Sequence, residues 1–199
     1  MLSPAARVLV LALTVMWACS PKEVPYADEI QSWHADKDRF MREADLSPIP
    51  REKRAGFPPL SYFPTEPEYR VPASLAVSKG TDVFEMPTST GPVRPMRRIG
   101  TLHFTLKGQA RTLTAFVDAT ENDMRRLFVP FGDLTNGTET YTGGRYLDLT
   151  RTATGIYDLD FNRAYHPSCV YNPQYECPIP PRENRLAVAI TAGEKLGPH

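Results

Sequence analysis

Apolar and polar residues alternate most clearly in the middle of the chain. Leu102, Phe104 and Leu106 are separated by single polar residues, and the period of two resumes after Lys107 and Gly108. This pattern predicts an antiparallel hairpin that turns at these last two residues. Shorter runs of the same kind predict further strands at residues 69–77, 82–86, 127–131, 145–149, 156–161 and 186–191.

A helical period replaces this alternation near the N-terminus. Apolar side chains recur mostly three, four or seven positions apart between residues 25 and 44: Tyr26, Ile30, Trp33, Phe40, Met41 and Ala44. Pro25 is tolerated in a first helical turn, and Pro48 disfavours helical geometry in the residue before it. We therefore expect one amphipathic helix at about residues 25–45.

The strands and the helix together predict a mainly β domain, α+β at most. An antiparallel β-barrel or β-sandwich with one N-terminal helix is the expected architecture. The chain has 199 residues and a hydrophobic content of 41%, which is enough for one domain with its own core. We assign residues 25–199 to that domain.

The first 19 residues have the composition of an export signal. Arg7 precedes an apolar run over residues 8–18, which is shorter than the roughly 20 residues that a membrane-spanning helix needs. Ala18 directly precedes Cys19, as in the cleavage site of bacterial lipoproteins. The expectation is a signal peptide at residues 1–18, a lipid anchor on Cys19 and a tether at residues 19–24; an ordinary signal peptide is the alternative.

This leader sets the expected location of the domain. Ser20 follows the cysteine and resembles the sorting signal for the outer membrane, so we expect a domain anchored on its periplasmic face. The chain has 23 basic and 23 acidic residues without a block of like charge, which argues against a nucleic-acid partner. The expected partners are the membrane and an unknown small ligand or envelope protein, and no cofactor is indicated.

Strand parity separates carboxylates from the predicted core. Leu147 and Leu149 share one face of their strand, whereas Asp148 lies on the other, and Asp158 and Asp160 oppose the core face of the next strand. These carboxylates either face water or gather in a concave polar site. In the second case they would join three further residues: Asp133, Glu139 and Arg145.

The segment from residue 160 to residue 184 is rich in tyrosine and proline and contains two cysteines. If Cys19 carries lipid, Cys169 and Cys177 remain as a pair in an oxidising compartment, which predicts a disulfide. There are two alternatives. One is a zinc site that includes His166 and the thiolates, and the other is a catalytic role for Cys169 as a nucleophile. We assign no metal site and interpret the segment as a rigid cap.

The turn-rich segment GDLTNGTET superficially suggests a calcium loop. Thr135 and Gly137 stand where such a loop needs further acidic side chains. Two tight turns joined by a short strand are the simpler interpretation.

Three stretches, FGDLTNGTETYTGGRYLDL, YDLDFNRAYHPSCVYNPQYECPIPPREN and AGEK, resemble the signature of a bacterial and archaeal family called domain of unknown function 1684. The resemblance implies no activity and no cofactor, and His166 stands where the family would have asparagine. It implies a candidate site at the positions that match the motif: Asp133, Thr135, Glu139, Tyr141, Arg145, Tyr146, Asp160, Asn162, Tyr165, Asn184 and Glu194.

Three functions follow as hypotheses. The first is a membrane-tethered domain of the cell envelope that binds a ligand or a protein. The second is an envelope hydrolase in which Asp133, Glu139 or Asp160 act as acid and base and Arg145 steadies an anionic group. The third is a purely structural envelope protein.

Overall fold

The computed structural model describes residues 24–80, 83–120 and 125–197. Its helices are α1 (Tyr26–Glu43) and the single turn α2 (Arg51–Arg54). The strands are β1 (Ser61–Tyr62), β2 (Arg70–Val77), β3 (Val83–Pro87), β4 (Val93–Leu106), β5 (Gln109–Asp118), β6 (Arg126–Phe131), β7 (Arg145–Thr150), β8 (Ile156–Asp160) and β9 (Glu194–Lys195). Four 3-10 helices lie between them: η1 (Pro67–Tyr69), η2 (Phe161–Arg163), η3 (Ser168–Val170) and η4 (Arg182–Asn184).

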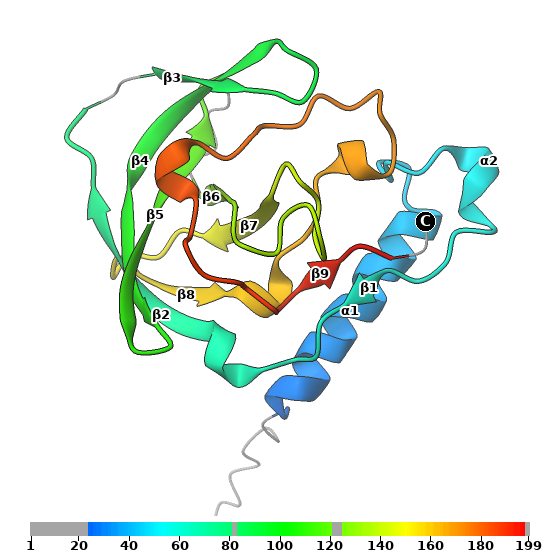
Figure 1. Ribbon diagram of the computed structural model, residues 1–199, viewed down its shortest axis with the longest axis horizontal. Helices are drawn as coiled ribbons and strands as arrows, with labels where there is room; N and C mark the ends of the chain where they lie inside the picture. Colours follow the sequence, from blue (N-terminus) through cyan, green and yellow to red (C-terminus); the bar gives the residue numbers. More distant parts are fainter. Residues whose placement is uncertain (1–23, 81–82, 121–124, 198–199) are drawn as a thin grey trace, which may run out of the picture.

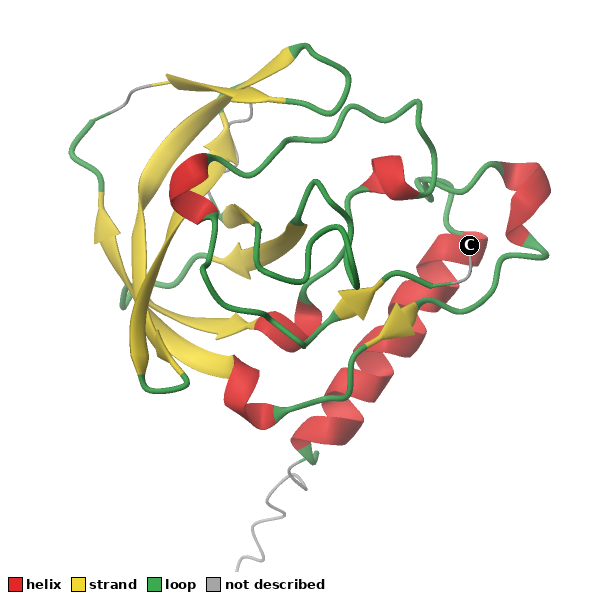
Figure 2. Cartoon of the chain, in the orientation of Figure 1, coloured by secondary structure: helices red, strands yellow, loops and turns green. Residues whose placement is uncertain are grey.

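The seven strands β2 to β8 form one antiparallel sheet that curls into a nearly closed barrel (Figures 1 and 2). The strand order is β7-β6-β5-β4-β2-β8, with β3 paired to β4. The two end strands, β7 and β8, are consecutive in the chain and lie near each other. The predicted fold class is therefore confirmed, and of the two architectures the barrel is the correct one.

The hairpin between β4 and β5 has the predicted turn. Lys107 and Gly108 adopt φ angles of 49° and 74°, the combination that suits a two-residue turn between twisted strands. β4 begins at Val93, well before the alternation at Leu102, Phe104 and Leu106, and its register shifts between Arg98 and Gly100. A Cβ at Gly100 would collide with the carbonyl oxygen of Ala76, so only glycine allows β2 to approach β4 this closely.

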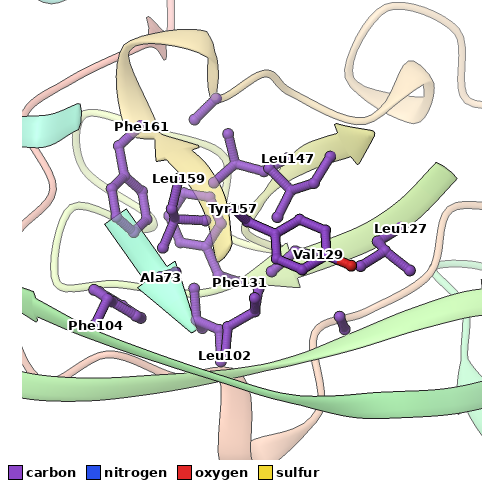
Figure 3. Close-up of a cluster of buried hydrophobic side chains, with 14 of the residues drawn as sticks. Ala73, Leu102, Phe104, Leu127, Val129, Phe131, Leu147, Tyr157, Leu159 and Phe161 are labelled. Atoms are coloured by element: carbon purple, nitrogen blue, oxygen red, sulfur yellow. The ribbon is translucent and has the colours of Figure 1, made fainter. Parts of the chain in front are cut away.

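The core fills the inside of the barrel with alternate residues of the strands (Figure 3). Leu102 and Leu113 come from the hairpin, and Leu147 and Leu159 come from β7 and β8, as parity predicts. These four side chains are at most 2% exposed. Burial of this set is the main driving force for closing the sheet.

Helix α1 lies outside the barrel, beside the small sheet of β1 and β9 (Figure 1). Its bounds confirm the helix predicted at about residues 25–45. Met41 of α1 packs with Ile49 and Leu60 in a separate hydrophobic cluster. The side chain of Asp38 also accepts a hydrogen bond from the Leu60 amide at 2.9 Å. These contacts hold the helix against the outer side of the domain.

The strand predicted at residues 186–191 is wrong, because this segment is irregular coil. Its backbone groups form no regular ladder. The Leu186 amide donates to the Gly132 carbonyl and the Val188 carbonyl accepts from the Leu134 amide, and side chains provide further partners. The Ile190 amide donates to Asp133 Oδ1 at 3.2 Å, and the Ile190 carbonyl accepts from Arg145 Nη2 at 2.7 Å. A coil whose backbone is hydrogen-bonded by side chains can have the same alternation of apolar residues as a strand, so the sequence pattern does not distinguish the two.

Candidate functional site

A cavity of about 500 Å³ lies between helix α1 and the outer side of β7 and β8. Its walls are largely apolar and include Trp33, Phe40 and Met41 from the helix and Tyr171 from the segment after η3. Charged, imidazole and phenolic groups also line it: Asp36, Lys37, Arg126, Asp148, Asp158, Asp160, Arg163, Tyr165 and His166. A concave, mostly apolar space with a few polar groups is the usual form of a small-ligand site.

Lys37 is placed in this cavity by the helical repeat. Trp33 and Met41 lie one turn before and after it on the same face of α1. Its ammonium lies 3.3 Å from the carboxylate of Glu194 and 4.1 Å from the ring centre of Tyr165. Burial lowers the pKa of Lys37, and the attraction of Glu194 opposes that shift.

Glu194 is fully buried at the floor of this network. Burial by itself would raise the pKa of its carboxyl group, but Lys37 and the hydrogen bonds from His166 outweigh burial and hold the pKa below its ordinary value. Glu194 is therefore an anion at neutral pH. Because its strand β9 pairs with β1, the charge is fixed in position beneath the helix.

His166 connects this network to the next loop. Its Nε2 accepts a hydrogen bond from the Tyr141 amide at 3.2 Å, and its Nδ1 lies 3.3 Å from Glu194 Oε1. An Nε2 that accepts must carry no proton, so the proton of the neutral ring is on Nδ1 and faces the carboxylate. Both ring nitrogens are engaged, which leaves neither free to act as a base or to bind a metal.

Tyr165 forms the centre of the outer wall. Its hydroxyl donates to Asp148, which also accepts from Arg126 Nη2 at 2.5 Å. Burial and the neighbouring Asp148 charge raise the pKa of Tyr165 well above its ordinary value, so the phenol remains protonated. The Arg126 side chain is 71% exposed and lies at the mouth of the cavity.

A second cavity of about 320 Å³ continues from the first. The two share Arg126, Asp148, Tyr165 and Ser168, so they form one depression, which we call the outer groove. The second part is lined by apolar residues of the barrel's outer side and by the tyrosine-rich segment: Met96, Phe128, Tyr146, Tyr175, Cys177 and Pro178. The segment predicted to be a cap therefore lines part of the outer groove.

The acidic site expected around Arg145 is not formed as predicted. Arg145 is fully buried and its Nη2 lies 2.9 Å from Asp133 Oδ2. Glu139 is exposed, and Asp160 belongs to a different hydrogen-bond network. Parity correctly places Asp148, Asp158 and Asp160 outside the core, and they share the first cavity, but Asp133 and Arg145 line neither part of the outer groove.

Arg145 organises the C-terminal coil instead of a ligand. Its guanidinium donates to the carbonyl oxygens of Ala192 at 2.5 Å, Glu194 at 3.1 Å and Ile190 at 2.7 Å. Burial lowers the pKa of Arg145, and the charge of Asp133 opposes that shift. A guanidinium with a paired carboxylate and three carbonyl partners is a structural group in this barrel.

Asp160 and Asn162 join the start of α1 to the barrel. Asp160 Oδ1 accepts from the Tyr26 hydroxyl at 2.8 Å and from the Asn162 amide at 3.0 Å. The Asn162 side chain also bonds to both backbone groups of Glu66. Burial and Asp160 raise the pKa of Tyr26. These residues position the helix above the outer groove.

The other motif residues have structural partners. The Asn184 side chain bonds to both backbone groups of Thr114 and to the Pro130 carbonyl, as a strand residue would. The Thr135 hydroxyl donates to Asp133 Oδ1 at 2.6 Å. Of the candidates, those that line the outer groove are Tyr146, Asp160 and Tyr165, with Glu194 behind Lys37.

The predicted Cys169–Cys177 disulfide is not present in the structure, where both residues are free thiols. They are nevertheless neighbours, because the Cys169 amide donates to the sulfur of Cys177 at 3.1 Å. Over residues 24–80, 83–120 and 125–197, no group of three or more His, Cys, Asp or Glu side chains is arranged to hold a metal ion.

Lys37, Trp33 and Arg126 are among the groove residues that sequence reasoning did not assign to a site. One signal was available, since Lys37 interrupts the apolar face of α1 between Trp33 and Met41. A cation at such a position is often held by a buried partner. No local pattern identifies Arg126, because its partner Asp148 lies on the neighbouring strand.

The leader and Cys19 lie outside the described residues. In the part of the chain that is described, no helix has the length and apolar character needed to cross a membrane.

Comparisons with known proteins give a family and a fold, but no activity. A family model described as "Protein of unknown function (DUF1684)" matches residues 55–195. An uncharacterised protein of Haloarcula marismortui, solved by solution NMR, is 41% identical, with a TM-score of 0.67 over 85% of this chain and 93% of that one. No curated protein matches the chain.

Proposed function

Because the chain belongs to the family of proteins of unknown function DUF1684, whose description assigns no activity, we propose a function from the site itself. The domain binds a small molecule in the outer groove. This ligand has an apolar body and one hydrogen-bond acceptor, a carboxylate or amide oxygen. The observation that carries the proposal is the position of Lys37, which lines the groove while its ammonium is paired with the fully buried Glu194.

The ammonium of Lys37 offers donors to a ligand. It has three N–H groups, and one ion-pair partner is identified for it among the described residues, Glu194. The Tyr165 ring lies under it at 4.1 Å and provides no acceptor oxygen in that direction. A ligand oxygen in the groove would therefore accept a hydrogen bond from the Lys37 ammonium, which Glu194 already holds in position.

The walls favour an apolar ligand body. Trp33 and Phe40 of α1 and Tyr171 are aromatic residues that line the first cavity. A volume of about 500 Å³ is within the range of small-molecule sites. The carboxylates of the site have cationic partners, as Asp148 has in Arg126 and Asp158 in Arg70. Binding rather than hydrolysis is favoured, because His166 and Tyr165 are already committed to hydrogen bonds.

A thermal-shift titration tests the ligand class. Octanoate and octanamide share an eight-carbon skeleton with octylamine, but only the first two have an acceptor oxygen and lack a positive charge. We expect octanoate and octanamide to raise the melting temperature and octylamine to leave it unchanged. The double variant Lys37→Met/Glu194→Gln, which removes both charges of the pair, should lose the octanoate shift. Equal shifts with octylamine, or an unchanged shift in the double variant, would contradict the proposal.

We also propose that the domain is exported and held at the periplasmic face of the outer membrane by lipid on Cys19, with the disulfide between Cys169 and Cys177 formed there. The support is the leader composition and the contact between the two thiols. Metabolic labelling with a radioactive fatty acid tests the anchor. The full chain should be labelled and should be found in the membrane fraction. The Cys19→Ser variant should carry no label and should be absent from that fraction.

A further inference from the structure

Cys169 and Cys177 are two free thiols on neighbouring parts of the tyrosine-rich segment. The Cys169 amide donates a hydrogen bond to the Cys177 sulfur at 3.1 Å. Cys169 is the middle residue of the single turn Ser168–Val170, which follows Pro167, and Cys177 immediately precedes Pro178. The two sulfurs are thus brought together by backbone contacts in a segment with restricted conformations.

The backbone around Cys177 is fixed to the barrel. The Ser89 amide donates to the Cys177 carbonyl at 2.9 Å, and the Cys177 amide donates to Ser89 Oγ at 3.2 Å. The Tyr146 hydroxyl donates to the Pro178 carbonyl at 2.5 Å. Cys177 is therefore held in place by hydrogen bonds to two parts of the barrel.

The two thiols differ in environment. Cys169 is partly exposed, whereas Cys177 is 6% exposed. The pKa of Cys169 is lowered to about 6, chiefly by the hydrogen bond from Cys177, while burial acts against this; Ser89 and Tyr141 are further hydrogen-bonding partners. The pKa of Cys177 is raised, because its thiol donates to Cys169 and is also buried. One thiol is thus accessible as a thiolate, and the other is retained as a neighbouring proton donor.

We propose that Cys169 and Cys177 are a site of thiol–disulfide exchange, in which Cys169 attacks an external disulfide and Cys177 resolves the product. This inference is independent of the ligand proposed for the outer groove. It goes beyond a structural disulfide, because it assigns different roles to the two sulfurs and identifies the co-reactant as an organic disulfide.

The exchange proceeds in two balanced steps. The Cys169 thiolate attacks one sulfur of R–S–S–R, the external S–S bond breaks, and RS⁻ leaves with the bonding electron pair and takes up a proton. Cys177 then loses its proton and attacks the Cys169 sulfur of the mixed disulfide, which releases the second RS⁻. In total two protein thiols are oxidised to one disulfide, and R–S–S–R is reduced to two RSH.

Mass spectrometry of the full-length reduced chain with oxidised glutathione tests this assignment. The wild type should lose two hydrogens as the internal disulfide forms. Cys177→Ser keeps a hydroxyl that can donate to the Cys169 sulfur, so this variant should accumulate a mixed disulfide that maps to the Cys169 peptide. Cys169→Ser should form an adduct on Cys177 at least about tenfold more slowly, because the remaining thiol is buried. Peptide mapping distinguishes both sites from Cys19.

A measurement on the wild type removes any dependence on how well the variants fold. Brief alkylation of the reduced chain with iodoacetamide should label Cys169 before Cys177, with a rate that reaches half its maximum near pH 6. The proposal is overturned if Cys177 is labelled first or equally fast, or if the Cys177→Ser variant forms no adduct with glutathione. It is also overturned if the rate at Cys169 rises only near pH 8.5, as for an ordinary thiol.

Discussion

The ammonium of Lys37 lies 3.3 Å from the carboxylate of Glu194, and this ion pair connects helix α1 to strand β9. The Lys37 side chain is 16% exposed and that of Glu194 is 1% exposed. A pair removed this far from water is costly to break from one side, because the remaining charge stays buried without its partner. The pair therefore supports both the attachment of the helix and the groove beside it.

Replacing Lys37 alone should destabilise the domain strongly. Lys37→Met keeps most of the side-chain volume but leaves Glu194 as a buried charge, so we expect a loss of about 3 to 5 kcal/mol in the free energy of unfolding. Urea unfolding followed by circular dichroism measures this loss. The exposed Lys53→Met is the matched control and should stay within about 0.5 kcal/mol of the wild type.

The double variant Lys37→Met/Glu194→Gln distinguishes the loss of the whole ion pair from the loss of one partner. Because no charge is left behind, its loss of stability should be clearly smaller than that of Lys37→Met. If the two proteins unfold at the same urea concentration, the ion pair is not what holds the helix.

The barrel could be predicted from the sequence, because its signal is local. The alternation at Leu102, Phe104 and Leu106 reflects one core face, and the positive φ angles at Lys107 and Gly108 are typical of the turn that joins the two strands. The same reasoning fails at residues 186–191. There Asp133 and Arg145 bond to the backbone from distant parts of the chain.

The candidate site was predictable only in part, since charged residues in a motif do not reveal their partners. Arg145 looks like a ligand-binding group in sequence, yet it is buried among carbonyl oxygens. Lys37 and Glu194 are far apart in sequence and meet only because α1 packs beside β9. Parity correctly assigns Asp148 to the outer side of β7, but it gives no indication of the helix opposite.

Glu194 should contribute a measurable acid dependence. Its folded pKa lies below the ordinary value of 4.5, so its stabilisation is fully present above pH 4.5 and is lost as the pH falls through the lower, folded value. The Glu194→Gln variant lacks this contribution. Between about pH 6 and pH 3 the wild type should therefore lose more unfolding free energy than the variant.

Other carboxyl groups titrate in the same pH range, so the contribution of Glu194 is the difference in unfolding free energy between the wild type and Glu194→Gln. Urea unfolding midpoints of both proteins, measured at the same pH values, give this difference. Parallel curves for the wild type and Glu194→Gln would show that Glu194 is not stabilised as an anion in the fold.

Arg145 should be essential for the C-terminal coil. Arg145→Met leaves Asp133 charged and buried and removes the donors to three carbonyl oxygens, so we expect a loss of about 3 to 5 kcal/mol or failure to fold. Arg145→Lys restores the charge but not the planar set of donors, and should recover only part of the stability. The control is Arg51→Met, since the Arg51 side chain is 78% exposed and its surface ion pair contributes little. Equal stability of Arg145→Met and Arg51→Met would contradict the structural role of Arg145.

Tyr165 allows the ring and the hydroxyl to be tested separately. Tyr165→Phe removes the hydrogen bond to Asp148, whose side chain is 23% exposed and keeps Arg126 as a partner. We therefore expect a loss of only about 1 to 2 kcal/mol. The ring below Lys37 remains, so octanoate should still raise the melting temperature by a similar amount. Tyr165→Leu removes the ring as well, which frees the Lys37 ammonium to change position. Its octanoate shift should fall well below that of Tyr165→Phe, and equal shifts in the two variants would mean that the ring does not position Lys37 for the ligand.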